Sequence, residues 1–248
     1  MAEIVSVISG KGGTGKTSLC AAVASCLAAG GARVLCIDAD VGLRNLDISL
    51  GMSDEPILPF TAVMRGEYPL EKASVHPRLA GLRVLTAPIT ESAESLDAGQ
   101  FARLLRQAEE HFDWIFLDAP AGIGAGFRLA TGEAGRAIVV AASDPASLRD
   151  AARATDVLLA ENPRIEAQLV VNRVSPVLYR RMQATIDDVM DGVGLPLLGV
   201  VPDDASVTLA AAEGKPLVQY TYHGAALACL HIAKRLCGQR VPLMKITR

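Results

Sequence analysis

The fold of this 248-residue chain is decided by residues 3–18, which read EIVSVISGKGGTGKTS. The apolar run at 4–8 predicts a buried strand, and an Ala-rich helical segment follows the stretch. Between them, residues 10–17 match the pattern G-x-x-x-x-G-K-T, whose glycines let successive backbone N–H groups face one concavity that holds phosphate oxygens. The order of strand, loop and helix predicts a site for a nucleoside triphosphate. A glycine-rich turn that matches by chance is the alternative.

Two side chains of this loop have definite expected tasks. Lys16 would place its charge near the β- and γ-phosphates, and the hydroxyl of Thr17 can ligate Mg²⁺. The helix that begins near Lys16 adds its positive N-terminal end. We expect nine residues to contact the nucleotide: Gly10, Lys11, Gly12, Gly13, Thr14, Gly15, Lys16, Thr17 and Ser18.

A second lysine, Lys11, lies at the mouth of the loop. One lysine suffices for the phosphates bound by the same chain, so Lys11 is either a solvated surface lysine or a cation delivered to a partner's nucleotide. The second reading is analogous to an arginine finger supplied in trans.

Residues 9–17, SGKGGTGKT, resemble the deviant Walker A motif of the MinD/ParA family of ATPases. In that family the early lysine marks proteins that hold two ATP molecules between two subunits. The resemblance covers residues 2 to about 238 and implies a P-loop NTPase that binds ATP and Mg²⁺ and forms a homodimer on ATP binding. It implies catalytic roles for Lys11 and Lys16.

Asp38 ends the strand-like run 33–38, and a second aspartate, Asp40, follows it. Residues two apart on a strand face the same way, so both carboxylates can point to one place. Near a triphosphate they could coordinate Mg²⁺ indirectly and orient an attacking water; solvated aspartates at a strand-to-loop junction are the alternative. Residues 40–47 resemble the first switch of MinD proteins more than that of general ParA proteins. By that resemblance Asp40 is a third catalytic residue, and Asn45 reports the nucleotide state to partners.

A further carboxylate, Asp118, ends the apolar run 114–118, WIFLD. Its position after the phosphate loop identifies a Walker B strand that delivers one carboxylate to the Mg²⁺ shell. With Thr17 and Asp38 it completes the expected metal-binding set. Gly122 lies in the following glycine-rich loop, which resembles the second switch of the family.

Asn172 lies near the end of the strand-like run 167–173 and can pair with the N6 and N7 edge of adenine. A turn-capping asparagine is the alternative. The N-K-x-D sequence of guanine-specific P-loop proteins is absent from the sequence, so ATP is favoured over GTP. The family encloses the base with this asparagine and with a segment that matches Pro202 and Asp203.

Residues 143–150 predict a capped helix start. Capping alone explains its Ser, Asp and Pro. The resemblance implies in addition that Arg149 and Asp150 contact regulatory partners or the dimer interface.

Strand-length apolar runs alternate with helical segments along the chain. This alternation predicts a doubly wound, mostly parallel α/β sheet with helices on both faces. We expect one P-loop ATPase domain at 1–238 and a short tail at 239–248, with a single helix at 179–192 and a last helix at 224–237 that turns Leu227, Leu230 and Leu236 to the core. The expected strands are 3–9, 33–38, 82–87, 113–118, 136–142, 167–173 and 196–201.

The composition of the chain disfavours several classes of protein. The net charge of −3 disfavours a dedicated nucleic-acid binder, and no specific nucleic acid is expected. The five cysteines form no C-x-x-C pair, which favours reduced core thiols in the cytosol over a metal or cluster site. No signal peptide or membrane-spanning segment is predicted.

The tail combines Arg240, Lys245 and Arg248 with Leu, Met and Ile, and no acidic residue follows Glu213. Pro242 could begin a short helix, and basic charge among apolar side chains suits an anionic membrane. A frayed, soluble end is the alternative. We therefore expect a cytoplasmic protein, with peripheral attachment to the inner face of the cell membrane as an open option.

The resemblance implies an ATPase switch that dimerises with ATP, hydrolyses it to reopen, and regulates the position of the cell division site with regulatory partners. Two alternatives remain open: a ParA-like cargo-positioning protein that binds DNA, and a flagellar-number regulator. The second type carries a glutamine-bearing N-terminal activation segment, whereas this sequence starts directly with its first strand. A nitrogenase-iron-protein type is disfavoured because no cysteine lies at 119–126.

Overall fold

The apolar runs form an eight-stranded sheet in the computed structural model, which describes residues 2–182 and 185–244. The strand order is β3-β4-β2-β5-β1-β6-β7-β8, and every neighbouring pair is parallel except β3 with β4. The strands are β1 (Glu3–Ile8), β2 (Val34–Asp38), β3 (Ser74–His76), β4 (Leu79–Leu85), β5 (Trp114–Asp118), β6 (Arg136–Ala142), β7 (Glu166–Val174) and β8 (Leu197–Pro202).

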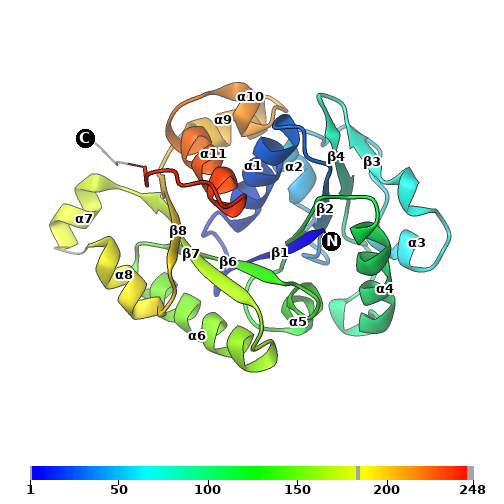
Figure 1. Ribbon diagram of the computed structural model, residues 1–248, viewed down its shortest axis with the longest axis horizontal. Coiled ribbons are helices and arrows are strands. Elements are labelled where there is room, and N and C mark those ends of the chain that lie inside the picture. The colour runs from blue at the N-terminus through cyan, green and yellow to red at the C-terminus, as the bar shows by residue number, and fades with distance from the viewer. Residues whose placement is uncertain (1, 183–184, 245–248) are drawn as a thin grey trace.

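Helices cover both faces of this sheet (Figure 1). They are α1 (Lys16–Ala29), α2 (Leu46–Leu50), α3 (Phe60–Met64), α4 (Ala98–Glu109), α5 (Ala125–Thr131), α6 (Pro145–Glu161), α7 (Pro176–Met182), α8 (Ile186–Val193), α9 (Ser206–Ala212), α10 (Leu217–Tyr220) and α11 (Gly224–Leu236), with 3-10 turns at Leu70–Lys72 and Ala93–Ser95. Helices α1, α2, α9, α10 and α11 pack on one face, and α3, α4, α5, α6 and α8 pack on the other.

Each face has its own apolar core because the central strands are buried on both sides. Alternate residues of β1 divide between the cores: Ile4 and Ile8 join one, and Val5 and Val7 join the other. This burial explains why the strands read as continuous apolar runs rather than alternating ones. The predicted doubly wound, mostly parallel α/β fold is confirmed.

Two predicted details are wrong, and one strand was missed. The single helix expected at 179–192 is two helices, because Thr185 caps a new one at α8 through a reciprocal capping box with Asp188. Leu236 faces the core as expected, but Leu227 is only partly buried and Leu230 is exposed. The short antiparallel edge strand β3 was not predicted.

The cysteines follow the prediction with one exception. Cys20, Cys26, Cys36 and Cys229 are buried and reduced, whereas Cys237 is exposed where α11 ends. Cys237 therefore fills no core, contrary to the expectation for all five thiols.

The described part of the tail, residues 239–244, forms no helix, so Pro242 begins none there. Lys245 and Arg248 lie outside the described residues. Among the helices that the structure describes, none has the length and apolar character needed to cross a bilayer.

Candidate nucleotide-binding site

The phosphate-type loop joins the end of β1 to the start of α1 at the edge of the sheet where the parallel strands end. Gly13 and Gly15 have left-handed φ angles of 82° and 85°, a region that disfavours residues with a Cβ atom. Within the described chain, no protein acceptor takes the backbone N–H groups of residues 10–15. These donors remain available to an anion, as a phosphate loop requires.

Side chains of β7 hold this loop from behind. The amide Nδ2 of Asn172 donates to the carbonyl of Thr14 at 2.7 Å, and Arg173 donates to the carbonyl of Gly13 at 3.1 Å. A Cβ on Gly15 would collide with the Asn172 amide. The carbonyls of Gly13 and Thr14 thus accept hydrogen bonds from β7, while the N–H groups of the loop stay available to a ligand.

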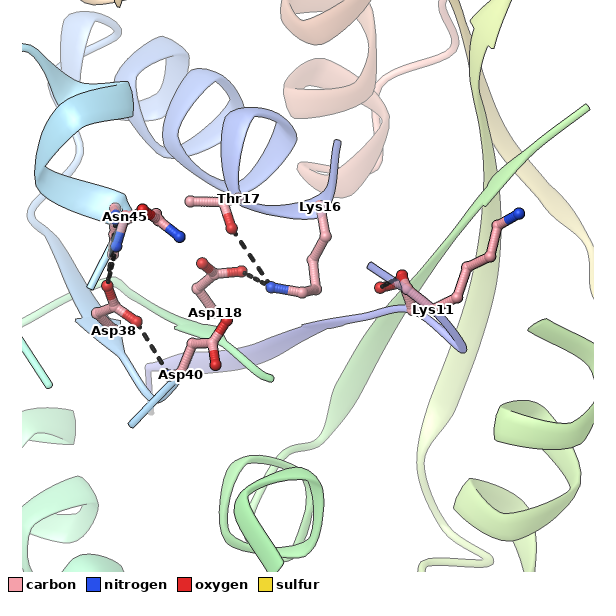
Figure 2. Close-up of polar contacts among 9 residues, drawn as sticks. Lys11, Lys16, Thr17, Asp38, Asp40, Asn45 and Asp118 are labelled. Carbon is pink, nitrogen blue, oxygen red and sulfur yellow. Dashed lines mark hydrogen bonds and ion pairs between the residues drawn. The ribbon is translucent and has the colours of Figure 1, made fainter. Parts of the chain in front are cut away.

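Lys16 and Asp118 form a buried ion pair at the centre of the site (Figure 2). Nζ of Lys16 lies 2.7 Å from Oδ1 of Asp118, and the two side chains are 7% and 1% exposed. Burial raises the pKa of Asp118, while the charge of Lys16 lowers it. Lys16 thereby supplies the positive charge that a buried carboxylate needs.

Asp38 holds the loop after β2 through three backbone hydrogen bonds. Its Oδ1 accepts from the N–H of Asp40 at 3.0 Å, and its Oδ2 accepts from the N–H groups of Asn45 and Leu46, both at 3.1 Å. Burial first, and the charge of Asp118 second, raise the pKa of Asp38 to about 7. Asp38 therefore couples the segment 40–46 to the centre of the site.

Asp40 is only half-buried and lies beside Asp38 and Asp118 in Figure 2. Burial raises its pKa, and the positive charge of Lys16 partly offsets that effect. The expectation that Asp38 and Asp40 share one region is met. Asp40 keeps the solvent contact that a group orienting a water molecule needs.

The residues expected to bind Mg²⁺ gather beside the loop and fit that ion. Oδ2 of Asp118 is buried and has no hydrogen-bond partner in the described structure. Thr17 lies next to it, with Oγ1 3.4 Å from Nζ of Lys16. Mg²⁺ in such sites takes oxygen ligands from one or two carboxylates together with substrate phosphates. Thr17, Asp38 and Asp118 supply that donor set.

The expected base-binding residues border one cavity of about 190 Å³ next to the loop. Asn172, Pro202 and Asp203 line it together with Gly15 and Ser18. The amide of Asn172 has one N–H committed to the loop and retains a second N–H and its oxygen. The cavity therefore offers the polar edge that an adenine could use, and base binding stays a prediction.

Lys11 lies apart from this cluster (Figure 2). Its Nζ pairs with Oδ1 of Asp144 at 2.8 Å rather than with any group of the site. The structure thus separates Lys11 from Lys16, although both belong to the same eight-residue pattern.

The expected switch residues surround the loop. Asn45 is exposed just before α2, and the N–H of Gly122 donates to the carbonyl of Ser9 at 3.1 Å. Arg149 is exposed on α6, and the backbone of Asp150 lies so close to Gly10 that a Cβ there would collide with it. Both switch loops and α6 therefore touch or flank the phosphate loop, and the partner roles of these residues stay predictions.

Arg173 is a site residue that sequence reasoning missed. Its φ of 55° is unusual for a residue with a side chain. That backbone turns its guanidinium to the Gly13 carbonyl and to within 3.5 Å of Asp203 Oδ1. No local pattern predicts this conformation, because it depends on the loop 160 residues earlier in the chain.

Comparison with known proteins identifies close counterparts of this fold and site. Residues 5–217 match the family described as the CobQ/CobB/MinD/ParA nucleotide binding domain. A septum site-determining protein MinD from a Synechocystis strain is 38% identical, with 98% of this chain and 92% of the relative covered. The septum site-determining protein MinD of Bacillus subtilis is 33% identical over the same shares.

Solved structures of MinD proteins have the same fold as this chain. The MinC:MinD cell division protein complex of Aquifex aeolicus contains a chain with a TM-score of 0.90 and 31% identity, covering 98% of this chain and 99% of that one. The MinD of Pyrococcus horikoshii, complexed with Mg-ADP, has a TM-score of 0.82 and 26% identity, covering 95% and 96% of the two chains. The predicted P-loop NTPase fold is confirmed.

Proposed function

The chain belongs to the CobQ/CobB/MinD/ParA family of nucleotide-binding proteins and has septum site-determining MinD proteins among its relatives, and from this premise we propose that it is a MinD-like, Mg²⁺-dependent ATPase switch. ATP closes two copies into a dimer, and hydrolysis to ADP and phosphate reopens it. The dimer's task is spatial regulation of the cell division site.

One observation carries the biochemical part of this proposal. The buried pair of Lys16 and Asp118 lies against a loop whose N–H groups have no protein acceptor in the described chain. Such an arrangement has a positive charge and free donors on one side and carboxylates on the other. A triphosphate can bind to the positive charge and the free N–H donors, and a divalent cation can bind to the carboxylates.

In this proposal, each group of site residues has the task in nucleotide binding or hydrolysis that its position allows. Lys16 exchanges Asp118 for the β- and γ-phosphates, and the loop N–H groups hold the remaining oxygens. Thr17, Asp38 and Asp118 hold Mg²⁺, which neutralises phosphate charge when bound. Asp40 orients the attacking water, since it is the acidic side chain of this cluster that keeps contact with solvent. Asn172, Pro202 and Asp203 enclose the adenine.

Dimerisation is supported by the position of Lys11. It stands outside its own site, partly exposed, where a second copy facing the sheet edge can meet it. In the dimer, each Lys11 reaches the phosphates of the other subunit and lowers the barrier to hydrolysis there.

The biological task is supported by the relatives. Several are septum site-determining MinD proteins, and a solved structural counterpart is named as a complex of MinC with MinD. We infer a regulatory protein partner of the division-site system, with Asn45, Gly122, Arg149 and Asp150 close to its binding surface. These residues adjoin the nucleotide loop, so a partner there senses the nucleotide state.

The hydrolysis proposal is tested with Asp40→Ala and Lys16→Ala in calorimetric titrations with MgATP and in phosphate-release assays. Asp40→Ala should bind MgATP with affinity within about threefold of the wild type, yet lose about 100-fold or more of its turnover. Lys16→Ala should lower the affinity by at least about 100-fold, because it removes a buried charge from the phosphates. Native turnover by Asp40→Ala would contradict its assigned role.

We also propose weak attachment of the ATP-bound dimer to anionic membranes through the basic and apolar tail, since two tails act together in a dimer. Co-sedimentation with anionic liposomes should be greater with ATP than with ADP and should disappear when the chain is cut after Gly238. Salt-sensitive binding to plain duplex DNA, with none to liposomes, would favour a ParA-like role instead.

A further inference from the structure

The C-terminal end of α2 is in direct backbone contact with the turn between α9 and α10. The helix ends at Gly51, whose φ of 68° is left-handed. A Cβ atom on Gly51 would lie 2.5 Å from the carbonyl oxygen of Gly214 and 2.7 Å from the backbone nitrogen of Lys215. The two backbones therefore approach to a distance that only glycine permits at this position.

The hairpin of β3 and β4 holds the same two elements together. His76 is 1% exposed, and its Nδ1 accepts the N–H groups of Arg78 and Leu79 at 3.0 and 3.2 Å. The ring proton therefore lies on Nε2, which donates to the carbonyl of Leu50 in α2 at 2.8 Å. The guanidinium of Arg78 donates to the Gly214 carbonyl at 2.9 Å. One hairpin turn thus binds α2 through His76 and the α9–α10 turn through Arg78.

Helices α9 and α10 also border the cavity expected to hold the base. Val207 and Thr208 of α9 and Leu217 of α10 line that cavity. α2, α9 and α10 lie on the same face of the sheet (Figure 1), and Leu217 belongs to the same apolar core as Leu50 of α2. A base in the cavity therefore contacts helices that pack against α2.

The other end of α2 is fixed to the metal-binding side of the site. Leu46, the first residue of the helix, is fully buried, and Oδ2 of Asp38 accepts its N–H and that of Asn45, both at 3.1 Å. α2 has only five residues, or about 7.5 Å along its axis. Order imposed on one end of so short a helix reaches the other end.

We propose that α2 couples the base cavity to the first switch and that Arg78 is a positioning residue for this coupling. The inference rests on the proposed nucleotide site. A base that fixes α9 and α10 also fixes α2, and the N–H groups of Asn45 and Leu46 then stay bonded to Asp38. The ordering cost is met once by the base and is lower for Mg²⁺ and the phosphates. Binding energy from the base is thereby used at the phosphate end of the nucleotide.

Hydrogen exchange of the Leu46 amide, followed by NMR with saturating Mg²⁺, tests this coupling. The two ligands are ADP and ribose 5-diphosphate, which has the sugar and phosphates of ADP but no base. In the wild type, ADP should slow the exchange about two- to 30-fold more than ribose 5-diphosphate, the range found for coupling through packed networks. Equal slowing by the two ligands would overturn the proposal.

Arg78→Ala tests the assigned role of the arginine. Arg78 is exposed, so the variant should fold, and it loses the hydrogen bond to the Gly214 carbonyl. The ratio of the two exchange rates should fall by at least about twofold, the lower end of what one hydrogen bond contributes. A ratio equal to that of the wild type would show that Arg78 has no part in the coupling.

The matched control is Arg83→Ala in the same hairpin. In the described structure Arg83 donates to the carbonyls of Glu71 and Ala73, in the segment that leads into β3, rather than to the α9–α10 turn. The variant removes the same side chain and charge and should leave the exchange ratio at the wild-type value. An equal loss in both variants would indicate general loosening of the hairpin and overturn the role of Arg78.

Calorimetry separates this inference from the proposed function. Because coupling is reciprocal, Mg²⁺ should raise the affinity of the wild type for ADP by a larger factor than its affinity for ribose 5-diphosphate, and this excess should shrink in Arg78→Ala. Binding of both ligands without any excess would leave the nucleotide site intact and overturn the coupling. If neither ligand binds, the proposed nucleotide site is wrong and the inference fails with it.

Discussion

At the scale of single residues, the charged side chains of the site already have partners within the protein, and a bound nucleotide can replace some of those partners. Lys16 is bonded to Asp118, and Asp38 is bonded to three backbone N–H groups. The buried carboxylates carry raised pKa values because burial penalises their charged forms. Mg²⁺ favours those charged forms, so metal and nucleotide reverse a penalty that the free protein bears.

This penalty predicts a pH dependence of stability that depends on Asp38. Its pKa is about 7 in the folded protein against 3.8 for the ordinary group, so the folded state keeps a proton that the unfolded state releases above about pH 4. The free energy of unfolding of the nucleotide-free protein should therefore fall by about 2–3 kcal/mol between about pH 5 and pH 7.5 through this group. Urea unfolding at both values measures it.

Asp38→Asn provides the comparison, because it has no proton to lose and its side-chain oxygen can still accept backbone hydrogen bonds. Slopes from Asp118 and other acids are common to both proteins, so the difference between them isolates Asp38. Parallel curves for the wild type and Asp38→Asn would show that Asp38 titrates normally.

At the scale of elements, close packing between α11 and β8 depends on the absence of a side chain at Gly199. A Cβ there would collide with Cγ1 of Ile232, which is 1% exposed in α11. The helix therefore sits against the strand at a distance that only glycine permits, behind the cavity predicted to hold the base.

Gly199→Ala should lower the free energy of unfolding by about 1–3 kcal/mol through overpacking. In an Ile232→Ala background the same substitution should cost nothing further, because the obstructing atoms are gone. Gly192→Ala in α8, which meets no neighbour within 4 Å, should instead stabilise by up to about 1 kcal/mol. Additive costs for Gly199→Ala and Ile232→Ala in denaturant unfolding would disprove the contact.

The elements that the sequence predicted best are those with a strong local cause. The seven expected strands are continuous apolar runs, and Asp118 ends its strand at the place that a Walker B motif requires. The break at Thr185 has a local signal in its capping box with Asp188, but the helical periodicity across 179–192 masked it. Strand β3 has three residues and pairs only with β4 at the edge of the sheet, and so short a strand shows no hydrophobic periodicity in the sequence.

The site was predictable to the extent that its residues belong to contiguous motifs. Asp38 and Asp118 each end a strand, Asn172 lies two residues before the end of β7, and the parallel sheet brings these positions together. The contacts that join distant segments were not predictable: Arg173 with the Gly13 carbonyl, and Lys11 with Asp144. These depend on the register of β7 and on the start of α6 relative to the loop, which no local pattern encodes.

At the scale of the whole molecule, the apolar residues that stabilise the fold are separate from the charged residues expected to bind the nucleotide. Two apolar cores lie on opposite faces of the sheet, and the charged groups gather where its parallel strands end. One subunit completes its own phosphate site with Lys16 but leaves Lys11 outside it. We therefore expect the nucleotide to be neutralised fully only when two subunits face each other.

Sedimentation velocity with ATP and Mg²⁺ tests this claim most directly, using Asp40→Ala to prevent turnover. Asp40→Ala should sediment as a dimer with ATP and as a monomer with ADP. Adding Lys11→Ala should leave it monomeric with ATP bound, whereas adding Lys72→Ala, at an exposed lysine remote from the loop, should not. An ATP-dependent dimer that survives the loss of Lys11, or the absence of any dimer with ATP, would contradict the account.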